Sequence, residues 1–124
     1  MAANPSNRAS ELSLATEKGS SETIVRVTGR ITTTSCAALD TAARDLIASE
    51  KQIVLDLANV DYIDSAGLGT LVSVYMHARR AACDLRMANP KQRIKDLFNR
   101  SGLSMIFDRQ SFDALWDAWS STNR

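Results

Sequence analysis

The feature that most constrains the fold of this chain is a change of apolar periodicity around Ser65. Residues 53–58 form a short apolar run with a single carboxylate, which is typical of a strand in a sheet covered by helices. From Ser65 to Ala82, apolar residues recur every three or four positions and predict an amphipathic helix. The stripe consists of Leu68, Leu71, Val72, Tyr75, Ala78 and Ala82. Between the two segments, Asp61 and Asp64 lie in a predicted short acidic loop. A buried strand followed closely by a long helix favours an α/β fold.

Strand and helix patterns alternate along the rest of the chain. Residues 12–16 and 23–31 alternate apolar and polar side chains on either side of a turn-like segment, so they predict a hairpin. The further predicted elements are a helix that starts after residues 33–35, a strand over 84–88, a helix around 94–98, a strand over 105–107 and a terminal helix that Ser111 caps. This order predicts a single α/β domain with a small mixed β-sheet and helices packed against it.

The length, the ends and the charge of the chain exclude several classes of protein. A chain of 124 residues has the size of one domain. Residues 1–10 are polar and aperiodic, so we expect a disordered arm there, a domain over residues 11–120 and a tail over residues 121–124. No apolar run is long enough to span a membrane and no secretory signal is present, which indicates a cytoplasmic protein without direct membrane insertion. A net charge of +1 without a dominant basic stripe argues against nucleic-acid binding. The basic residues of the helix around 94–98 are interpreted as a solvated face: Lys91, Arg93, Lys95 and Arg100.

No residue pattern predicts a metal, a cofactor or an enzyme active site. Cys36 and Cys83 lie far apart in helical patterns and His77 is the only histidine, whereas zinc needs about four ligands. Gly67 and Gly69 lack the spacing of a phosphate-binding loop. His77 is interpreted as an exposed helix residue and a poor catalytic base. We therefore expect a non-enzymatic protein that has no cofactor and is a monomer when free.

Two arrangements around Ser65 have competing interpretations. Asp56 and Asp64 are a candidate pair of catalytic carboxylates, but a glycosidase also needs a sugar cleft, of which a chain this short gives little sign. Ser65 is suited to cap the predicted helix by accepting hydrogen bonds from its first N–H groups. A serine at this place is also suited to carry a regulatory phosphate, which a helix N-terminus stabilises and the adjacent Asp64 repels. The residues alone leave both roles of Ser65 open.

A longer motif around Ser65 resembles a known family. The run from Val54 to Gly69, with the core Asp-Ser-Ala-Gly-Leu-Gly after a Leu-Asp-Leu strand, resembles the signature of STAS domains. This family includes bacterial anti-sigma factor antagonists and the cytoplasmic domains of sulfate transporters. Residues 27–31 resemble its early strand and glycine turn, and residues 85–90 resemble its fourth strand. The resemblance covers about residues 12–119, and it implies the compact fold of the family, a small sheet with helices packed against it.

The resemblance also implies a function and a site. A serine at the position of Ser65 is the phosphorylation site in many antagonists, so Ser65 is the expected switch. The implied partners are an anti-sigma factor serine kinase, which the unphosphorylated protein binds so that a sigma factor is released, and a phosphatase. Acidic residues near the serine help the kinase to recognise it in the family. The expected partner-binding residues are Asp56, Asp61, Asp64, Ser65, Ala66, Gly67, Leu68, Gly69 and Tyr75.

One position departs from the family pattern. Many antagonists carry an aspartate soon after the glycine turn, in a Gly-x-Leu-Asp arrangement near the phosphorylated serine. Here the run is Gly29-Arg30-Ile31-Thr32, so Thr32 replaces the acid and Arg30 adds a positive charge. This departure weakens the expectation that an ordinary anti-sigma kinase recognises Ser65. The alternative function is a STAS scaffold subunit of a membrane lipid or anion transport complex, in which Ser65 serves only as a helix cap.

Overall fold

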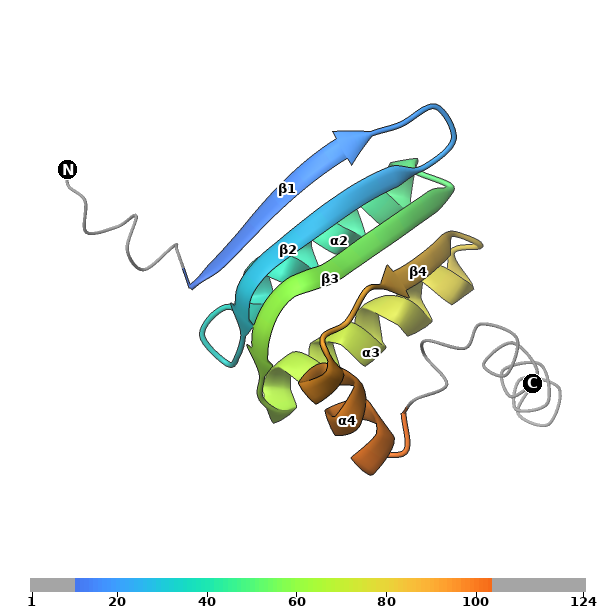
Figure 1. The fold of residues 1–124 in the computed structure, drawn as a ribbon. Coiled ribbons are helices and arrows are strands. Elements are labelled where there is room, and N and C mark those ends of the chain that lie inside the picture. Colours follow the sequence, from blue (N-terminus) through green and yellow to red (C-terminus); the bar gives the residue numbers. More distant parts are fainter. Residues whose placement is uncertain (1–10, 104–124) are drawn as a thin grey trace, which may run out of the picture.

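The computed structural model describes residues 11–103, which form a four-stranded mixed sheet with helices packed against it (Figure 1). The elements, labelled as in Figure 1, are β1 (Leu12–Lys18), β2 (Thr23–Ile31), α2 (Cys36–Ser49), β3 (Gln52–Ile63), α3 (Ser65–Arg80), β4 (Asp84–Ala88) and α4 (Gln92–Arg100). The strand order is β1-β2-β3-β4. β1 is antiparallel to β2, whereas β2, β3 and β4 run parallel. The predicted hairpin, the mixed sheet and the α/β fold class are therefore confirmed.

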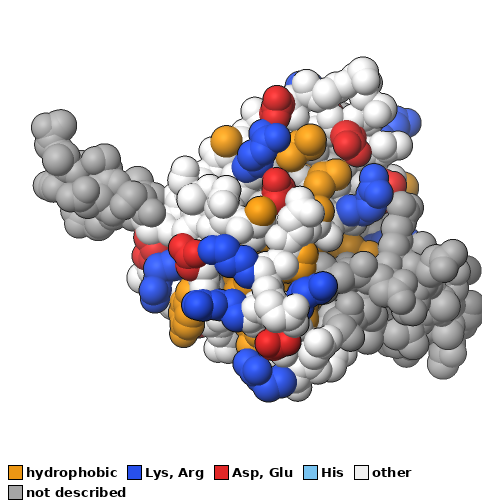
Figure 2. Space-filling model, in the orientation of Figure 1, with side chains coloured by type: hydrophobic (Ala, Val, Ile, Leu, Met, Phe, Trp, Pro, Cys, Tyr) orange, Lys and Arg blue, Asp and Glu red, His pale blue; other side chains and the backbone are white. Residues whose placement is uncertain are grey.

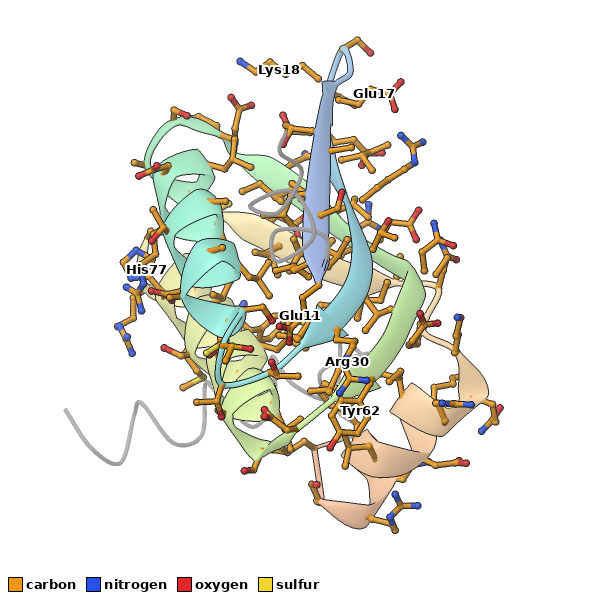
Figure 3. The ribbon with its side chains drawn as sticks, turned by 90° about the vertical axis from the view of Figure 1, so that its left-hand side faces the viewer. Glu11, Glu17, Lys18, Arg30, Tyr62 and His77 are labelled. Atoms are coloured by element: carbon orange, nitrogen blue, oxygen red, sulfur yellow. The ribbon has the colours of Figure 1, made fainter. Side chains whose placement is uncertain are left out.

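The core lies between the sheet and the two helices α2 and α3, which pack side by side on one of its faces (Figure 3). Alternate residues of the strands point into this layer, as the period of two in a strand requires. The fully buried strand residues include Val25, Val27, Ile53, Leu55 and Leu57, and they meet Leu39 and Ile47 of α2 and Leu71 and Val74 of α3. On the opposite face of the sheet, Arg26, Thr28 and Arg86 are exposed.

The predicted acidic loop after residue 58 is wrong, because β3 continues as a strand to Ile63. Its second half pairs with β2 as far as the Ile31–Ile63 partners, across two shifts of register. In this half Val60 and Ile63 are buried while Asp61 and Tyr62 are exposed. The long β3 therefore carries Tyr62 and Ile63 directly to the first turn of α3.

Two predictions about single side chains need correction. Cys83 is buried, but it lies in the turn between α3 and β4 rather than in a helix. Cys36 is the half-buried first residue of α2. His77 is half-buried rather than exposed, because its Nδ1 lies 3.2 Å from a guanidinium nitrogen of Arg44 on α2. The same Arg44 side chain donates to Ser73, so it bridges α2 and α3.

Several predicted segments lie outside the described residues: the N-terminal arm over 1–10, the strand over 105–107, the terminal helix after Ser111 and the tail over 121–124. The proposed domain boundaries, residues 11 and 120, stay predictions. Within residues 11–103, none of the helices has the length and apolar character needed to cross a membrane. The same range contains no cluster of three or more side chains suited to hold a metal ion.

Candidate functional site

Asp64 caps the N-terminus of α3. Its Oδ1 accepts a hydrogen bond from the amide of Gly67 at 2.8 Å. Its Oδ2 accepts from the amide and the hydroxyl of Thr33, at 3.0 Å and 3.2 Å, and so ties the β2–α2 loop to α3. The hydrogen bonds from the amides of Gly67 and Thr33 hold the pKa of Asp64 below its ordinary value. The interpretation of Ser65 as the capping residue is therefore wrong.

Ser65 is the first residue of α3, and its side chain is exposed. Among residues 11–103, no side chain or backbone group forms a hydrogen bond with its hydroxyl. The carboxylate of Asp64 already accepts the hydrogen bond from the Gly67 amide that a capping side chain would accept. The Ser65 hydroxyl therefore does not cap the helix. It stands in solvent at the positive end of the α3 dipole, where a phosphate would be stabilised.

We expect the two residues to differ in their effect on stability. Asp64→Ala removes the cap and both bonds to Thr33, so it should lower the melting temperature clearly. Asp64→Asn keeps a capping oxygen and should recover most of the loss. Ser65→Ala removes an exposed hydroxyl and should change the free energy of unfolding by no more than about 0.5 kcal/mol. Thermal unfolding followed by circular dichroism measures all three, and an equal loss for Ser65→Ala and Asp64→Ala would show that Ser65 shares the cap.

The other residues expected to bind a partner fall into two groups. Gly67 is buried, and a Cβ there would collide with the carbonyl group of Ile31; Tyr75 is only 3% exposed. Neither can contact a partner directly, which corrects the expectation for both. The remaining residues of the motif reach the surface: Asp61, Ser65 and Gly69 are exposed, and Asp64, Ala66 and Leu68 are half-buried.

Asp56 is not brought to Ser65. It lies on β3 seven residues before the strand ends at Ile63, which corresponds to about 23 Å along an extended strand. Its Oδ1 accepts hydrogen bonds from the amide of Ala58 at 3.0 Å and from the side chain of Asn89 at 3.2 Å. Paired catalytic carboxylates lie within about 10 Å of each other, so Asp56 and Asp64 do not form such a pair.

Glu11 is a site residue that the sequence analysis missed. Its carboxylate accepts hydrogen bonds from the hydroxyls of Thr32 and, at 2.8 Å, Thr34. These two bonds hold the pKa of Glu11 below its ordinary value. Glu11 approaches β2 at Gly29, which has φ of 111° and where a Cβ would collide with the Glu11 carbonyl. A carboxylate therefore stands against Thr32, although the chain has no acidic residue at position 32.

Tyr62 and Arg30 form an exposed pair beside this cluster (Figure 3). The Arg30 guanidinium lies 4.7 Å from the centre of the Tyr62 ring, which is a cation–π arrangement. Tyr62 is 45% exposed and is the one large apolar side chain with that degree of exposure among the described residues. Tyrosine and arginine are frequent in the energetically important centres of protein interfaces, so the pair suits a binding surface.

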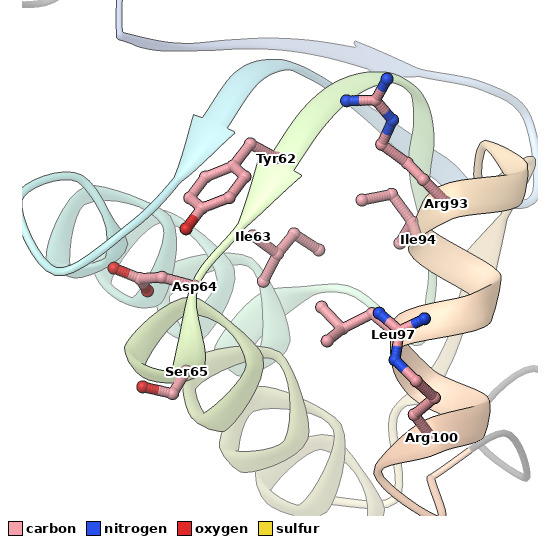
Figure 4. A pocket seen from close by; sticks show the side chains of 8 residues that line it. All are labelled: Tyr62, Ile63, Asp64, Ser65, Arg93, Ile94, Leu97 and Arg100. Atoms are coloured by element: carbon pink, nitrogen blue, oxygen red, sulfur yellow. The ribbon is translucent and has the colours of Figure 1, made fainter.

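A groove lies between the end of β3 and α4, next to Ser65 (Figure 4). Its volume is about 550 Å³, and its lining consists of Tyr62, Ile63, Asp64, Ser65, Arg93, Ile94, Leu97 and Arg100. Ile94 and Phe98 anchor α4 in the core, which leaves Arg93, Leu97 and Arg100 on the groove side of the helix. Of the four basic residues interpreted above as a solvated face, Arg93 and Arg100 therefore line the groove, whereas Lys91 and Lys95 do not.

Comparison with known proteins agrees with this architecture. A family model of the STAS domain matches residues 13–118, most of the chain. Among curated proteins, the chain is 36% identical over 58 residues to one from Bordetella bronchiseptica named "Putative anti-sigma factor antagonist BtrV". That match covers 47% of this chain and 50% of the relative, so the chain spans about half the length of the curated relative it matches.

Solved structures of low sequence identity share the fold. An anti-sigma factor antagonist from Mycobacterium paratuberculosis superimposes with a TM-score of 0.64 at 24% identity, over 77% of this chain and 82% of that one. The unphosphorylated form of the anti-sigma factor antagonist SpoIIAA superimposes with a TM-score of 0.65 at 15% identity, over 85% of this chain and 97% of that one. The phosphorylated form of SpoIIAA, a Bacillus cell fate determinant, superimposes with a TM-score of 0.61 at 15% identity, over 83% of this chain and 99% of that one.

Proposed function

The chain belongs to the STAS domain family, and we propose that it is an anti-sigma factor antagonist that works as a phosphorylation switch. In this proposal the protein has no catalytic activity of its own. With Ser65 unphosphorylated, it binds an anti-sigma factor that is a serine kinase, and the sigma factor held by that kinase is released. Phosphorylation of Ser65 breaks the complex, and a phosphatase restores binding. Such a role places the protein in the cytoplasm with the transcription machinery.

The observation that carries the proposal is the exposed hydroxyl of Ser65 at the start of α3. A kinase needs access to the hydroxyl, and no described residue covers it with a hydrogen bond. A phosphate there would meet the positive end of the helix dipole but also the carboxylate of Asp64, the adjacent residue. The added charge therefore alters the potential of this surface strongly, which is what a binding switch requires. The names of the similar proteins point in the same direction.

The proposed partner surface follows from which residues are accessible. It comprises Tyr62, Asp64, Ser65, Leu68 and Gly69, together with the exposed Asp61. Gly67 and Tyr75 support this surface from below. The carboxylate of Glu11 lies against Thr32, so it supplies an acidic group to the β2–α2 loop that adjoins Asp64. We propose that Glu11 takes the place of the aspartate that many antagonists carry at position 32.

Mass spectrometry of the intact protein tests the proposal. Incubation with ATP and each purified anti-sigma factor kinase of the source cell should add one phosphoryl group to the wild type and none to Ser65→Ala. Thr33→Ala is the matched control, because Thr33 is an exposed hydroxyl in contact with the same Asp64 carboxylate. It should still be phosphorylated.

Two other outcomes would change the assignment. Phosphate on the Ser65→Ala variant would move the switch to another hydroxyl, such as that of Thr33 or Thr34. No phosphate on the wild type with any of these kinases, together with no binding, would favour the scaffold subunit of a membrane transport complex instead.

A further inference from the structure

The groove between the end of β3 and α4 has a composition that the proposed switch does not by itself explain. Its floor is apolar, with Ile63 4% exposed, Ile94 2% exposed and Leu97 half-buried. One rim carries the exposed side chains of Arg93 and Arg100 from α4. The other rim carries the Tyr62, Asp64 and Ser65 side chains (Figure 4). An apolar strip with two cations on one side favours a ligand that combines an apolar group with negative charge.

The acidic groups close to this groove already have partners. The Asp61 carboxylate pairs with Lys91, whose hydrogen bond and charge hold the pKa of Asp61 below its ordinary value. The Asp64 carboxylate accepts from Gly67 and Thr33. The acidic side chains next to the groove are therefore already engaged elsewhere.

The two arginines of the groove form no close ion pair within the part of the chain that the structure describes, although the charge of Arg93 contributes to holding the pKa of Asp61 below its ordinary value. Arg93 donates to the backbone carbonyl of Asp61 at 3.3 Å, and neither Arg93 nor Arg100 has a carboxylate within ion-pair distance in residues 11–103. Lys and Arg side chains are gathered on the face over α4 (Figure 2). Two guanidinium groups beside an apolar floor thus remain for an external anion.

We propose that this groove docks an acidic segment of the protein partner, with one apolar side chain seated on the floor and carboxylates paired with Arg93 and Arg100. The two arginines are seven residues apart on α4, which separates them by about 10 Å along the helix axis. A partner helix with glutamates at positions i and i+7 and a leucine between them matches this spacing. The identity of the partner as an anti-sigma factor rests on the proposed function, whereas the chemistry of the groove does not.

This docking mode gives a physical reason for the sign of the switch. Ser65 lies on the rim opposite the arginines, in the same groove. A phosphate on Ser65 adds a charge of about −1.5 to −2 at neutral pH, which would repel an acidic segment and compete for the arginines. Phosphorylation would therefore weaken docking without any change of fold.

The direct test uses two synthetic peptides and does not require the natural partner. Each is a capped amphipathic helix with leucine at the centre, and they differ only in carrying glutamate or lysine at the two flanking positions. In nitrogen-15 spectra of the full chain at low salt, the glutamate peptide should shift the amide signals of Ser65, Ile94, Leu97 and Arg100. The lysine peptide should bind at least about tenfold more weakly, because it places like charges together.

Charge-reversal variants show which side chains are responsible. Arg93→Glu and Arg100→Glu should each weaken binding of the glutamate peptide about tenfold. Lys95→Glu is the matched control, because Lys95 is an exposed basic residue of α4 that does not line the groove. Compared at about 0.15 M salt, where charges are screened beyond about 8 Å, this variant should change the affinity no more than about twofold, because its charge lies outside the contact. Ser65→Glu should weaken binding of the glutamate peptide several-fold, whereas Ser65→Gln should leave it nearly unchanged.

Three results would overturn the docking proposal. The first is equal binding of the two peptides, and the second is an equal loss for Lys95→Glu and Arg100→Glu, which would indicate only a diffuse charge effect. The third is a tighter response of the same signals to a single-stranded oligonucleotide, which would assign the groove to nucleic acid. A wild type that binds the glutamate peptide but none of the anti-sigma factors would reject the proposed function and leave the groove assignment standing.

Discussion

Replacing Gly67 with alanine is expected to lower the free energy of unfolding by about 2 kcal/mol, within the range of overpacked interiors. A Cβ at this position would overlap the carbonyl group of Ile31, at the end of β2. That carbonyl cannot move away easily, because it also accepts the amide of Asp64 at 3.1 Å. The clash therefore lies against backbone that β2, β3 and the start of α3 hold together. Urea unfolding followed by circular dichroism measures the loss.

Gly69→Ala is the matched control for this prediction. Gly69 is exposed, it lies two residues further along α3, and a Cβ there has no atom within 4 Å. Alanine favours a helix over glycine, so this variant should gain about 0.5 kcal/mol. If Gly67→Ala is as stable as the wild type, the close packing of α3 on Ile31 is not required. A substitution that probes the binding surface belongs at Gly69, because a change at Gly67 would test the fold.

The local periodicity of the chain was sufficient to predict its main elements. The spacing of Leu68, Leu71 and Tyr75 predicted α3, and the buried run ending at Leu57 predicted the centre of β3. Both signals arise because one face of each element packs against the same core, so burial repeats with the period of the element. The resemblance to the STAS family motif likewise identified the fold, because that motif spans the junction of β3 and α3.

The end of β3 and the cap of α3 depended on contacts distant in sequence. Asp61 and Tyr62 are polar or exposed and therefore resemble a loop, but pairing with β2 keeps them in a strand. Asp64 and Ser65 are both favoured capping residues, so their sequence does not decide between them. The bonds from Thr33, which lies 31 residues before Asp64, fix the Asp64 side chain in place.

The site residues that the sequence did not predict come from other elements of the fold. Glu11 precedes β1 and reaches Thr32 only because β1 pairs with β2. Arg93 and Arg100 lie on α4, and packing of Ile94 and Phe98 turns them toward Ser65. The sequence pattern of a helix predicts which of its faces is apolar, but it does not predict which other element its polar face will adjoin. The glycine within β2 was the one local signal that another backbone approaches there.

Ser65→Glu is expected to weaken binding of the anti-sigma factor at least about 30-fold, or about 2 kcal/mol, because like charges placed together in an interface cost several kcal/mol. The glutamate carboxylate would stand beside Asp64 on the rim of the groove, where the phosphate would be. Ser65→Ala should bind within about twofold of the wild type, since it removes an exposed hydroxyl without changing charge. Calorimetric titration of the purified partner with each variant measures these affinities.

Ser65→Gln separates charge from size, because glutamine has the shape of glutamate without its charge. If electrostatic repulsion is the cause, Ser65→Gln binds nearly as well as the wild type. The loss caused by Ser65→Glu should then shrink as salt is raised from low concentration to about 1 M, where charges are screened beyond about 3 Å. If Ser65→Gln loses as much as Ser65→Glu at every salt concentration, the partner packs closely on Ser65 and the switch is steric. Either result locates the partner at the start of α3, whereas full affinity of Ser65→Glu would place the partner surface elsewhere.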